Sequence, residues 1–199
     1  MKTNRYERFE LTKLQRDAYR NQMLNLLLRQ DFNYFITLNF FLPTATKQQE
    51  WQNGWAEPGR KNSALRPALN DLPVGYASGK KAIKRWQAMV DRKLLGRNWS
   101  EIDTDQRLFF LAFPELGGNS TRTDNNLHYH LLAWAPYDRD RFEGYLEKAW
   151  QKIIPSGDVD CQRIGHTHND KYKTRNYATK HLGRDDGIFN FIISTEFQA

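Results

Sequence analysis

The chain has 199 residues, of which 39% are hydrophobic and 27% charged, a composition typical of one globular domain with its own core. Its single cysteine, Cys161, excludes an internal disulfide framework and a multi-cysteine zinc site, and no apolar run approaches the roughly 18 residues that span a bilayer. The net charge of +7 is concentrated in residues 1–100, which carry 18 basic and 8 acidic side chains. We therefore expect a cytoplasmic protein, not associated with a membrane, with a polyanionic partner such as nucleic acid or, alternatively, a merely soluble basic protein.

The hydrophobic pattern predicts nine elements of secondary structure. Apolar residues that recur every three or four positions predict helices over residues 11–30, 79–96, 138–153 and 170–182. Aromatic and β-branched runs predict strands over residues 32–42, 107–113, 127–134, 158–164 and 188–194. Asp170 and Gly183 are expected to cap the last helix. Residues 44–78 have no clear period and are interpreted as an insertion within a single domain of residues 1–199.

The order of these elements predicts the fold class. Two strands in the middle of the chain are joined by a polar, hairpin-like connection, which makes them antiparallel neighbours. The other strands alternate with helices. We expect an α+β fold in which helices flank a mainly antiparallel sheet of about five strands, and a ferredoxin-like arrangement is one way to connect them.

A pair of histidines indicates a metal site. His128 and His130 lie two residues apart on a predicted strand, so both imidazoles project from the same face. Glu115 follows the preceding strand, and a hairpin would bring its carboxylate toward the same end of the sheet. Two imidazoles and one carboxylate suit a divalent metal and leave positions open for a substrate oxygen. Hydrogen-bonded surface histidines and a solvated turn glutamate remain the alternatives.

A tyrosine in the last predicted helix is a candidate nucleophile. Tyr177 shares a helix face with Lys180 and His181, three and four residues later, and with Lys173 one turn earlier. A tyrosine hydroxyl is a weak nucleophile, and nearby positive charge both favours its ionised form and neutralises a phosphate. A half-buried tyrosine among solvated lysines is the alternative.

Taken in chain order, the strand FITLNF, the His-x-His strand and the helical Tyr-x-x-Lys resemble the HUH endonucleases, in particular the single-tyrosine initiators (Rep) of rolling-circle replication. The resemblance covers residues 32–183. It implies that His128 and His130 bind Mg²⁺ or Mn²⁺, with Glu115 completing the site. It also implies that Tyr177 attacks single-stranded DNA to form a 5′-phosphotyrosine, assisted by Lys180. Tyr129 differs from the aliphatic residue usual between the histidines, and the insertion is absent from compact viral members.

The resemblance leaves several alternatives open. A second pair, His166 and His168, lies in a polar segment and could touch DNA, assist the tyrosine or bind the metal instead. Tyr172 is a competing nucleophile, but it lies about 140° around the helix from Tyr177 and has no lysine three residues later. A transposase, a mobilisation relaxase or a non-catalytic single-strand-binding domain would share most of these features.

Further expectations concern the partners. The resemblance implies single-stranded DNA or an origin hairpin as substrate, and a host helicase and polymerase as partners because the chain has no helicase domain. Basic residues of the helix 79–96 are candidates for contacts with the DNA backbone. The residues expected to contact DNA are Lys80, Lys81, Lys84, Arg85, Lys173 and His181. Trp86 and Trp99 are candidates for base stacking, with core packing as the alternative.

Overall fold

The computed structural model describes residues 12–40, 72–117, 126–155, 157–180, 182 and 191–197. Within them the strands are β1 (Tyr34–Asn39), β2 (Phe109–Gly117), β3 (Asn126–Trp134), β4 (Asp158–Arg163) and β5 (Ile192–Ile193). The α-helices are α1 (Lys13–Leu28), α3 (Leu72–Leu95), α4 (Arg139–Gln151) and α5 (His168–Ala178). Short 3₁₀ helices span Trp99–Glu101, Thr104–Gln106 and Ser194–Phe197.

The five strands form one antiparallel sheet in the order β4-β1-β3-β2-β5. Among the described residues, β1, α3, β2, β3, α4 and β4 follow one another in the ferredoxin-like βαββαβ order, with α1, α5 and β5 added to it. This arrangement confirms the predicted α+β fold with a five-stranded antiparallel sheet.

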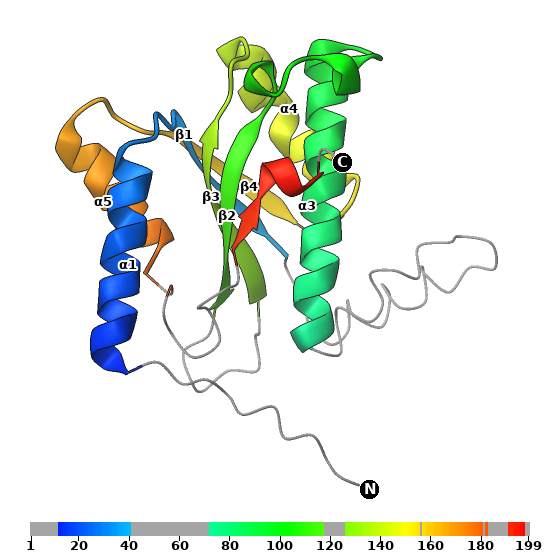
Figure 1. Ribbon diagram of the computed structural model, residues 1–199. Coiled ribbons are helices and arrows are strands. Elements are labelled where there is room, and N and C mark those ends of the chain that lie inside the picture. The colour runs from blue at the N-terminus through cyan, green and yellow to red at the C-terminus, as the bar shows by residue number, and fades with distance from the viewer. Residues whose placement is uncertain are drawn as a thin grey trace, which may run out of the picture.

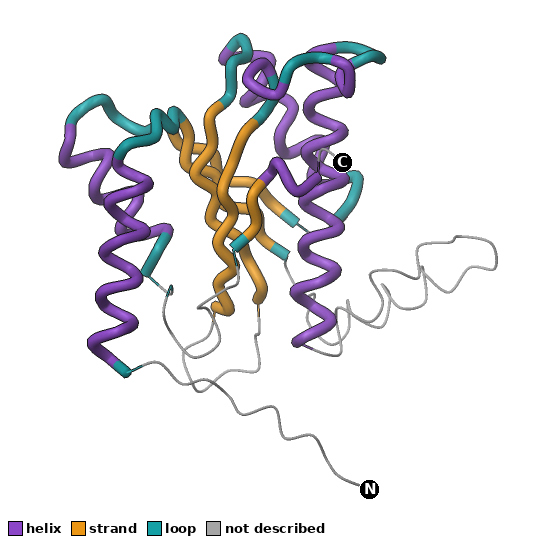
Figure 2. Tube along the Cα trace, viewed as in Figure 1, coloured by secondary structure: helices purple, strands orange, loops and turns teal. Residues whose placement is uncertain are grey.

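The sheet is the middle layer of three. α3 and α4 cover one face, and α1 and α5 cover the other (Figures 1 and 2). The first interface buries Ile36 and Leu131 of the sheet with Trp86 of α3, all 0% exposed. The second interface is smaller and joins Leu132 of β3 to Leu27 of α1 and Ala178 of α5. Because side chains alternate along a strand, β3 directs Tyr129 toward α3 and the flanking histidines toward α5.

Several predicted boundaries were wrong. α3 begins at Leu72, not at residue 79, so residues 72–78 belong to a helix. Pro73 fits there because the first turn of a helix needs no N–H donor from it, whereas Gly75 and Gly79 weaken the helical pattern in the sequence. Residues 44–71 of the expected insertion lie outside the described residues.

β2 also differs from its prediction, since it continues to Gly117 instead of ending at Phe113. A proline in the middle of a run argues against a central strand, which is why the sequence pattern stopped short of Pro114. Here β2 pairs with β5 only at Leu111 and Ala112, so the backbone at Pro114 has a neighbouring strand on one side alone within the described residues. This extension carries Glu115 into the sheet.

α5 was predicted over residues 170–182 with Asp170 as its N-cap, and both statements were wrong. The helix begins at His168, because the Thr167 hydroxyl oxygen caps it by accepting a hydrogen bond from the backbone N–H of Asp170 at 3.1 Å. It ends at Ala178, so Lys180 lies in the turn that follows. Gly183, the predicted C-terminal cap, lies outside the described residues.

No helix among the described residues has the length and apolar character to cross a membrane.

The buried carboxyl group of Asp91 links α3 to residues that flank strands β2 and β3. Asp91 is 0% exposed, and its Oδ1 accepts hydrogen bonds from the backbone N–H of Leu108 and the hydroxyl of Tyr137. Burial raises the pKa of Asp91 from its usual value of 3.8 to about 6, although both hydrogen bonds and the charge of Arg107 act in the opposite direction.

This shift predicts a pH dependence of stability. The folded-state pKa lies above the unfolded one, so the contribution of Asp91 is fully present below pH 3.8 and is lost as the pH rises through about 6. The loss amounts to about 3 kcal/mol by alkaline pH. We expect Asp91→Asn, whose side chain does not ionise, to lack this component. Urea unfolding at pH 4.5 and pH 8 gives the free energy of unfolding of the unmodified protein and of Asp91→Asn, and the contribution of Asp91 is the difference in how the two change with pH. The same change with pH in both proteins would contradict a raised pKa of Asp91.

Candidate active site

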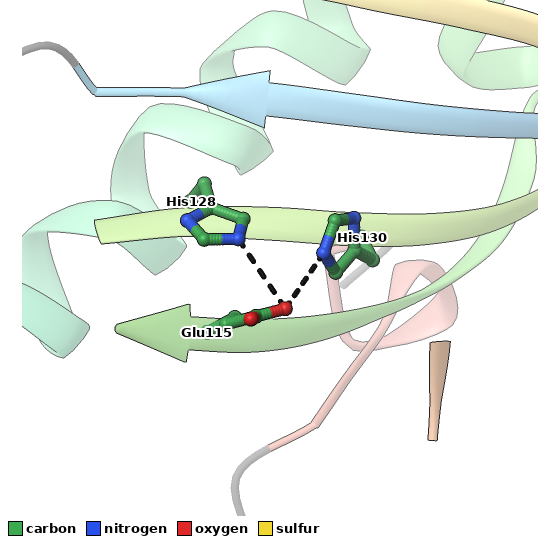
Figure 3. A group of neighbouring side chains, drawn as sticks. All are labelled: Glu115, His128 and His130. Atoms are coloured by element: carbon green, nitrogen blue, oxygen red, sulfur yellow. Dashed lines mark hydrogen bonds and ion pairs between the residues drawn. The ribbon is translucent and has the colours of Figure 1, made fainter. Parts of the chain in front are cut away.

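Three potential metal ligands meet on the face of the sheet covered by α5. Glu115 of β2 lies opposite His128 in the β2–β3 ladder, and His130 follows on the same face of β3. The Oε2 atom of Glu115 is 2.8 Å from Nε2 of His130 and 3.3 Å from Nε2 of His128 (Figure 3). All three ligand atoms lie within 4.8 Å of one another, and no other group of three or more metal-ligating side chains occurs in the described part of the chain.

The dimensions of this cluster suit one divalent cation. Two ligand atoms in adjacent positions around an ion at about 2.1 Å are separated by about 3 Å. The distances from Glu115 to the two histidines, 2.8 and 3.3 Å, bracket that separation. Two imidazoles and one carboxylate form a donor set used by transition metals that keep open positions for a substrate. The three side chains could therefore hold one metal ion with three protein ligands and leave positions open for other ligands.

The charge state of His130 agrees with this use. The pKa of His130 is lowered from 6.5 to about 4, mainly by burial and also by the neighbouring His128, whereas Glu115 acts in the opposite direction. His130 is therefore neutral at physiological pH, and its contact with Glu115 is a hydrogen bond, not an ion pair. A neutral imidazole has the lone pair that a metal requires.

Thr37 contacts the imidazole of His130 at Nδ1, the ring nitrogen that does not face Glu115. Thr37 lies opposite His130 in the β1–β3 ladder, and its Oγ1 is 3.1 Å from Nδ1 of His130. If Nε2 of His130 is to offer a lone pair to a metal, Nδ1 must carry the proton and donate it to Thr37. Without a metal, the proton of neutral His130 lies on Nε2 and is donated to Glu115, and Nδ1 accepts from the Thr37 hydroxyl. Because a hydroxyl can also accept, Thr37 can hold the other tautomer when a metal takes the place of the Nε2 proton.

We expect Thr37→Val to weaken Mn²⁺ binding by about tenfold, because valine keeps the shape and the strand preference of threonine but loses the hydroxyl. Calorimetric titration of the metal measures the change. Thr37→Ser, which keeps the hydroxyl, is the matched control and should retain most of the affinity. Equal affinities of the valine variant and the unmodified protein would show that Thr37 does not orient His130.

Tyr177 lies beside the metal-ligand cluster although it comes from a different element. Its ring is 5.0 Å from that of His130 and 5.9 Å from that of Phe35, centroid to centroid. The side chain is 48% exposed, although its ring packs against those of His130 and Phe35. Tyr172, the competing tyrosine, is 43% exposed on the same helix and makes no ring contact with the cluster among the described residues.

A buried arginine fixes the position of α5 and therefore of Tyr177. The Arg175 side chain is 0% exposed, and its guanidinium donates hydrogen bonds to the carbonyl oxygens of Leu27 at 2.8 Å and Gln30 at 2.7 Å. These carbonyls lie at the C-terminal end of α1, which is the negative end of its helix dipole. Arg175 thereby anchors the helix that carries the tyrosine to the helix beside it.

Lys180 connects the tyrosine to the candidate metal ligand Glu115. Its Nζ is 2.8 Å from Oε2 of Glu115 and 3.8 Å from the ring centroid of Tyr177. Burial by itself would lower the pKa of Lys180, but Glu115 and Tyr177 outweigh that effect and hold it above its usual value. Lys180 is therefore a permanent positive charge next to both the tyrosine and the carboxylate, although it does not belong to the helix as predicted.

The other residues expected to contact DNA lie elsewhere. Lys80, Lys81, Lys84 and Arg85 belong to α3, on the opposite face of the sheet from Glu115, and Lys80 forms an ion pair with Glu196. Lys173 is exposed on α5, and His181 lies outside the described residues. Trp86 is 0% exposed in the core, so its predicted alternative, core packing, is the observed one, whereas Trp99 is partly exposed beneath the guanidinium of Arg107.

The second histidine pair does not join the cluster. His166 and His168 are exposed, with His168 in the first turn of α5, and neither is part of the Glu115 group. Sequence reasoning missed two residues of the site, Phe35 and Thr37. Their alternation in FITLNF, with Ile36 and Leu38 on the core side, was the available signal that both belong to the face shared with the histidines.

Comparisons with known proteins place this chain in no family. No protein-family model matches it, and no characterised protein matches it. Among solved structures, it is similar to the hypothetical protein ORF119 from Sulfolobus islandicus rod-shaped virus 1, with a TM-score of 0.38 and 16% identity, covering 80% of this chain and 90% of that one.

Proposed function

We propose that this protein is a metal-dependent endonuclease that nicks and rejoins single-stranded DNA through a 5′-phosphotyrosine at Tyr177, in the initiation of rolling-circle replication. One observation carries the proposal: a half-exposed tyrosine packs against His130 of a His-His-Glu group that could hold a metal, and Lys180 contacts both Tyr177 and Glu115. These residues come from three separate segments, and a merely structural tyrosine would not require neighbours of this chemistry.

The chain's own groups have distinct tasks in the proposed reaction. The hydroxyl oxygen of Tyr177 attacks phosphorus, and the bond between phosphorus and the 3′ oxygen breaks. The phenol loses one proton and the leaving oxygen gains one, so a free 3′-hydroxyl forms without any co-reactant. Lys180 stabilises the developing phenolate and the charged phosphate. One phosphodiester replaces another, so the step is close to balanced in free energy and runs backward to rejoin the strand.

Mg²⁺ or Mn²⁺ held by Glu115, His128 and His130 would supply polarisation of a non-bridging phosphate oxygen. The imidazole ligands favour Mn²⁺, since Mg²⁺ prefers oxygen donors. We place the reaction in the cytoplasm, with an origin hairpin as substrate and a host helicase and polymerase as partners. A transposase or relaxase would use the same chemistry on other DNA.

The test is covalent capture. The purified protein is incubated with Mn²⁺ and a randomised single-stranded library, and the strands that resist denaturing extraction from the protein are sequenced. We expect a shared motif at the captured 5′ ends, with EDTA abolishing capture. Absence of any covalent adduct from single strands or hairpins, with either metal, would leave a non-catalytic binding domain on the same fold.

A further inference from the structure

The outer surface of α3 carries a stripe of like charge. Lys81, Lys84, Arg85 and Arg92 are all exposed, and their spacing of three, four and seven residues places them along one side of the helix. The stripe extends for about 16 Å at 1.5 Å per residue. The one acidic residue of α3, Asp91, is buried on the other side.

None of these four cations has an acidic partner within 4.0 Å among the described residues. Like charges three and four residues apart destabilise a helix by about 0.2–0.5 kcal/mol per pair. The neighbouring helix α4 shows the usual solution for a solvated surface, since its sequence holds three basic and three acidic residues and Arg139 pairs with Glu143 at 3.2 Å. The stripe on α3 is therefore not explained by solvation alone and is complementary to a polyanion.

The aromatic side chains near the stripe indicate which kind of nucleic acid it suits. Proteins that hold unpaired strands combine positive charge with aromatic side chains on which bases stack. The exposed large aromatic residues in the described part of the chain are Tyr172 and Tyr177, both on α5 across the sheet. Of the aromatic residues near the stripe, Trp86 is fully buried, and Phe197, whose ring centroid lies 5.9 Å from Nζ of Lys84, is only partly exposed. A surface with four exposed cations and no fully exposed aromatic ring among the described residues suits the phosphates of a double helix, whose bases are already stacked.

We propose that the α3 stripe, formed by Lys81, Lys84, Arg85 and Arg92, binds the phosphate backbone of duplex DNA, on the opposite side of the sheet from Tyr177. The protein then holds nucleic acid on two surfaces of different character: paired DNA against α3, and an unpaired segment against the face that carries Tyr177 and Phe35. Binding at α3 requires neither a metal nor reaction at Tyr177, so the inference stands apart from the proposed nicking activity.

The test compares two charge-reversed variants in the Tyr177→Phe background with EDTA present. Lys81→Glu/Arg85→Glu alters the stripe, and Arg141→Glu/Lys148→Glu changes the net charge equally on the exposed side of α4. Fluorescence anisotropy measures binding of a short blunt duplex and of one of its strands between about 50 and 200 mM salt. Circular dichroism and the thermal midpoint establish that both variants fold.

We expect the stripe variant to bind the duplex at least about tenfold more weakly than the α4 variant, and the slope of log K against log salt to fall by about two. The single strand should lose less affinity than the duplex. Equal duplex binding by the two variants would overturn the proposal. Loss of binding to anionic phospholipid vesicles without loss of duplex binding would overturn it as well, by identifying a membrane surface.

The two proposals fail in different ways. Stripe-dependent duplex binding without any covalent adduct would refute the nicking activity and leave the α3 surface intact. Covalent capture of DNA, together with duplex binding that does not depend on the α3 stripe, would support the nicking activity and refute the α3 proposal.

Discussion

Replacing Tyr177 with phenylalanine is expected to reduce formation of the covalent protein–DNA adduct by at least about a thousandfold, because the variant has no oxygen to attack phosphorus. The ring remains, so its contacts with His130 and Phe35 persist. Tyr177 is 48% exposed, and loss of its hydroxyl should change the free energy of unfolding by less than about 0.5 kcal/mol. The loss therefore reports on chemistry and not on folding.

Tyr172→Phe is the matched control for this experiment. It removes the same group from the same helix at a residue that is 43% exposed, away from the metal ligands. Denaturing gel electrophoresis with end-labelled DNA detects the adduct in both variants. An adduct that survives in Tyr177→Phe and disappears in Tyr172→Phe would reassign the nucleophile, and one that survives in both would point to a different residue type.

Loss of one metal ligand is the second large effect that we expect. His128→Ala should lower Mn²⁺ affinity by about a hundredfold or more, since the cluster supplies only three protein ligands. The His128 side chain is 16% exposed, so its truncation leaves a smaller cavity than that of His130, whose side chain is 6% exposed. Glu115→Gln tests the carboxylate with little change in volume. Calorimetry with Mn²⁺ measures affinity directly, without DNA.

His168→Ala is the control for ligand loss, because it removes an exposed imidazole that lies outside the cluster. Unchanged Mn²⁺ affinity in this variant, together with weak binding by His128→Ala and Glu115→Gln, is the expected pattern. The opposite pattern would move the metal to the second histidine pair. Thermal midpoints of each apoprotein separate loss of a ligand from loss of the fold.

The sequence sufficed to predict that His128 and His130 share a face, because the alternation of side chains along a strand does not depend on the rest of the fold. Side chains two residues apart share a face, so LHYHLLAW places His128 and His130 together and sends Tyr129 to the core wherever the strand lies. The α+β class followed in the same way from the order of periodic segments. Boundaries were less accurate at Pro114, Gly79 and Thr167, where single residues act against the average preference of their surroundings.

What the sequence by itself determined is the set of reactive groups and the face of the strand on which the histidines project. Only the tertiary structure decided that Glu115 faces His128, because the sequence pattern does not determine the register in which β2 pairs with β3. Only the docking of α5 on α1 through Arg175 brought Tyr177 against His130. The tertiary structure also separates the basic helix α3 from the site, because it lies on the opposite face of the sheet from α5 (Figure 1). Which face of a sheet a helix covers depends on how the whole chain packs.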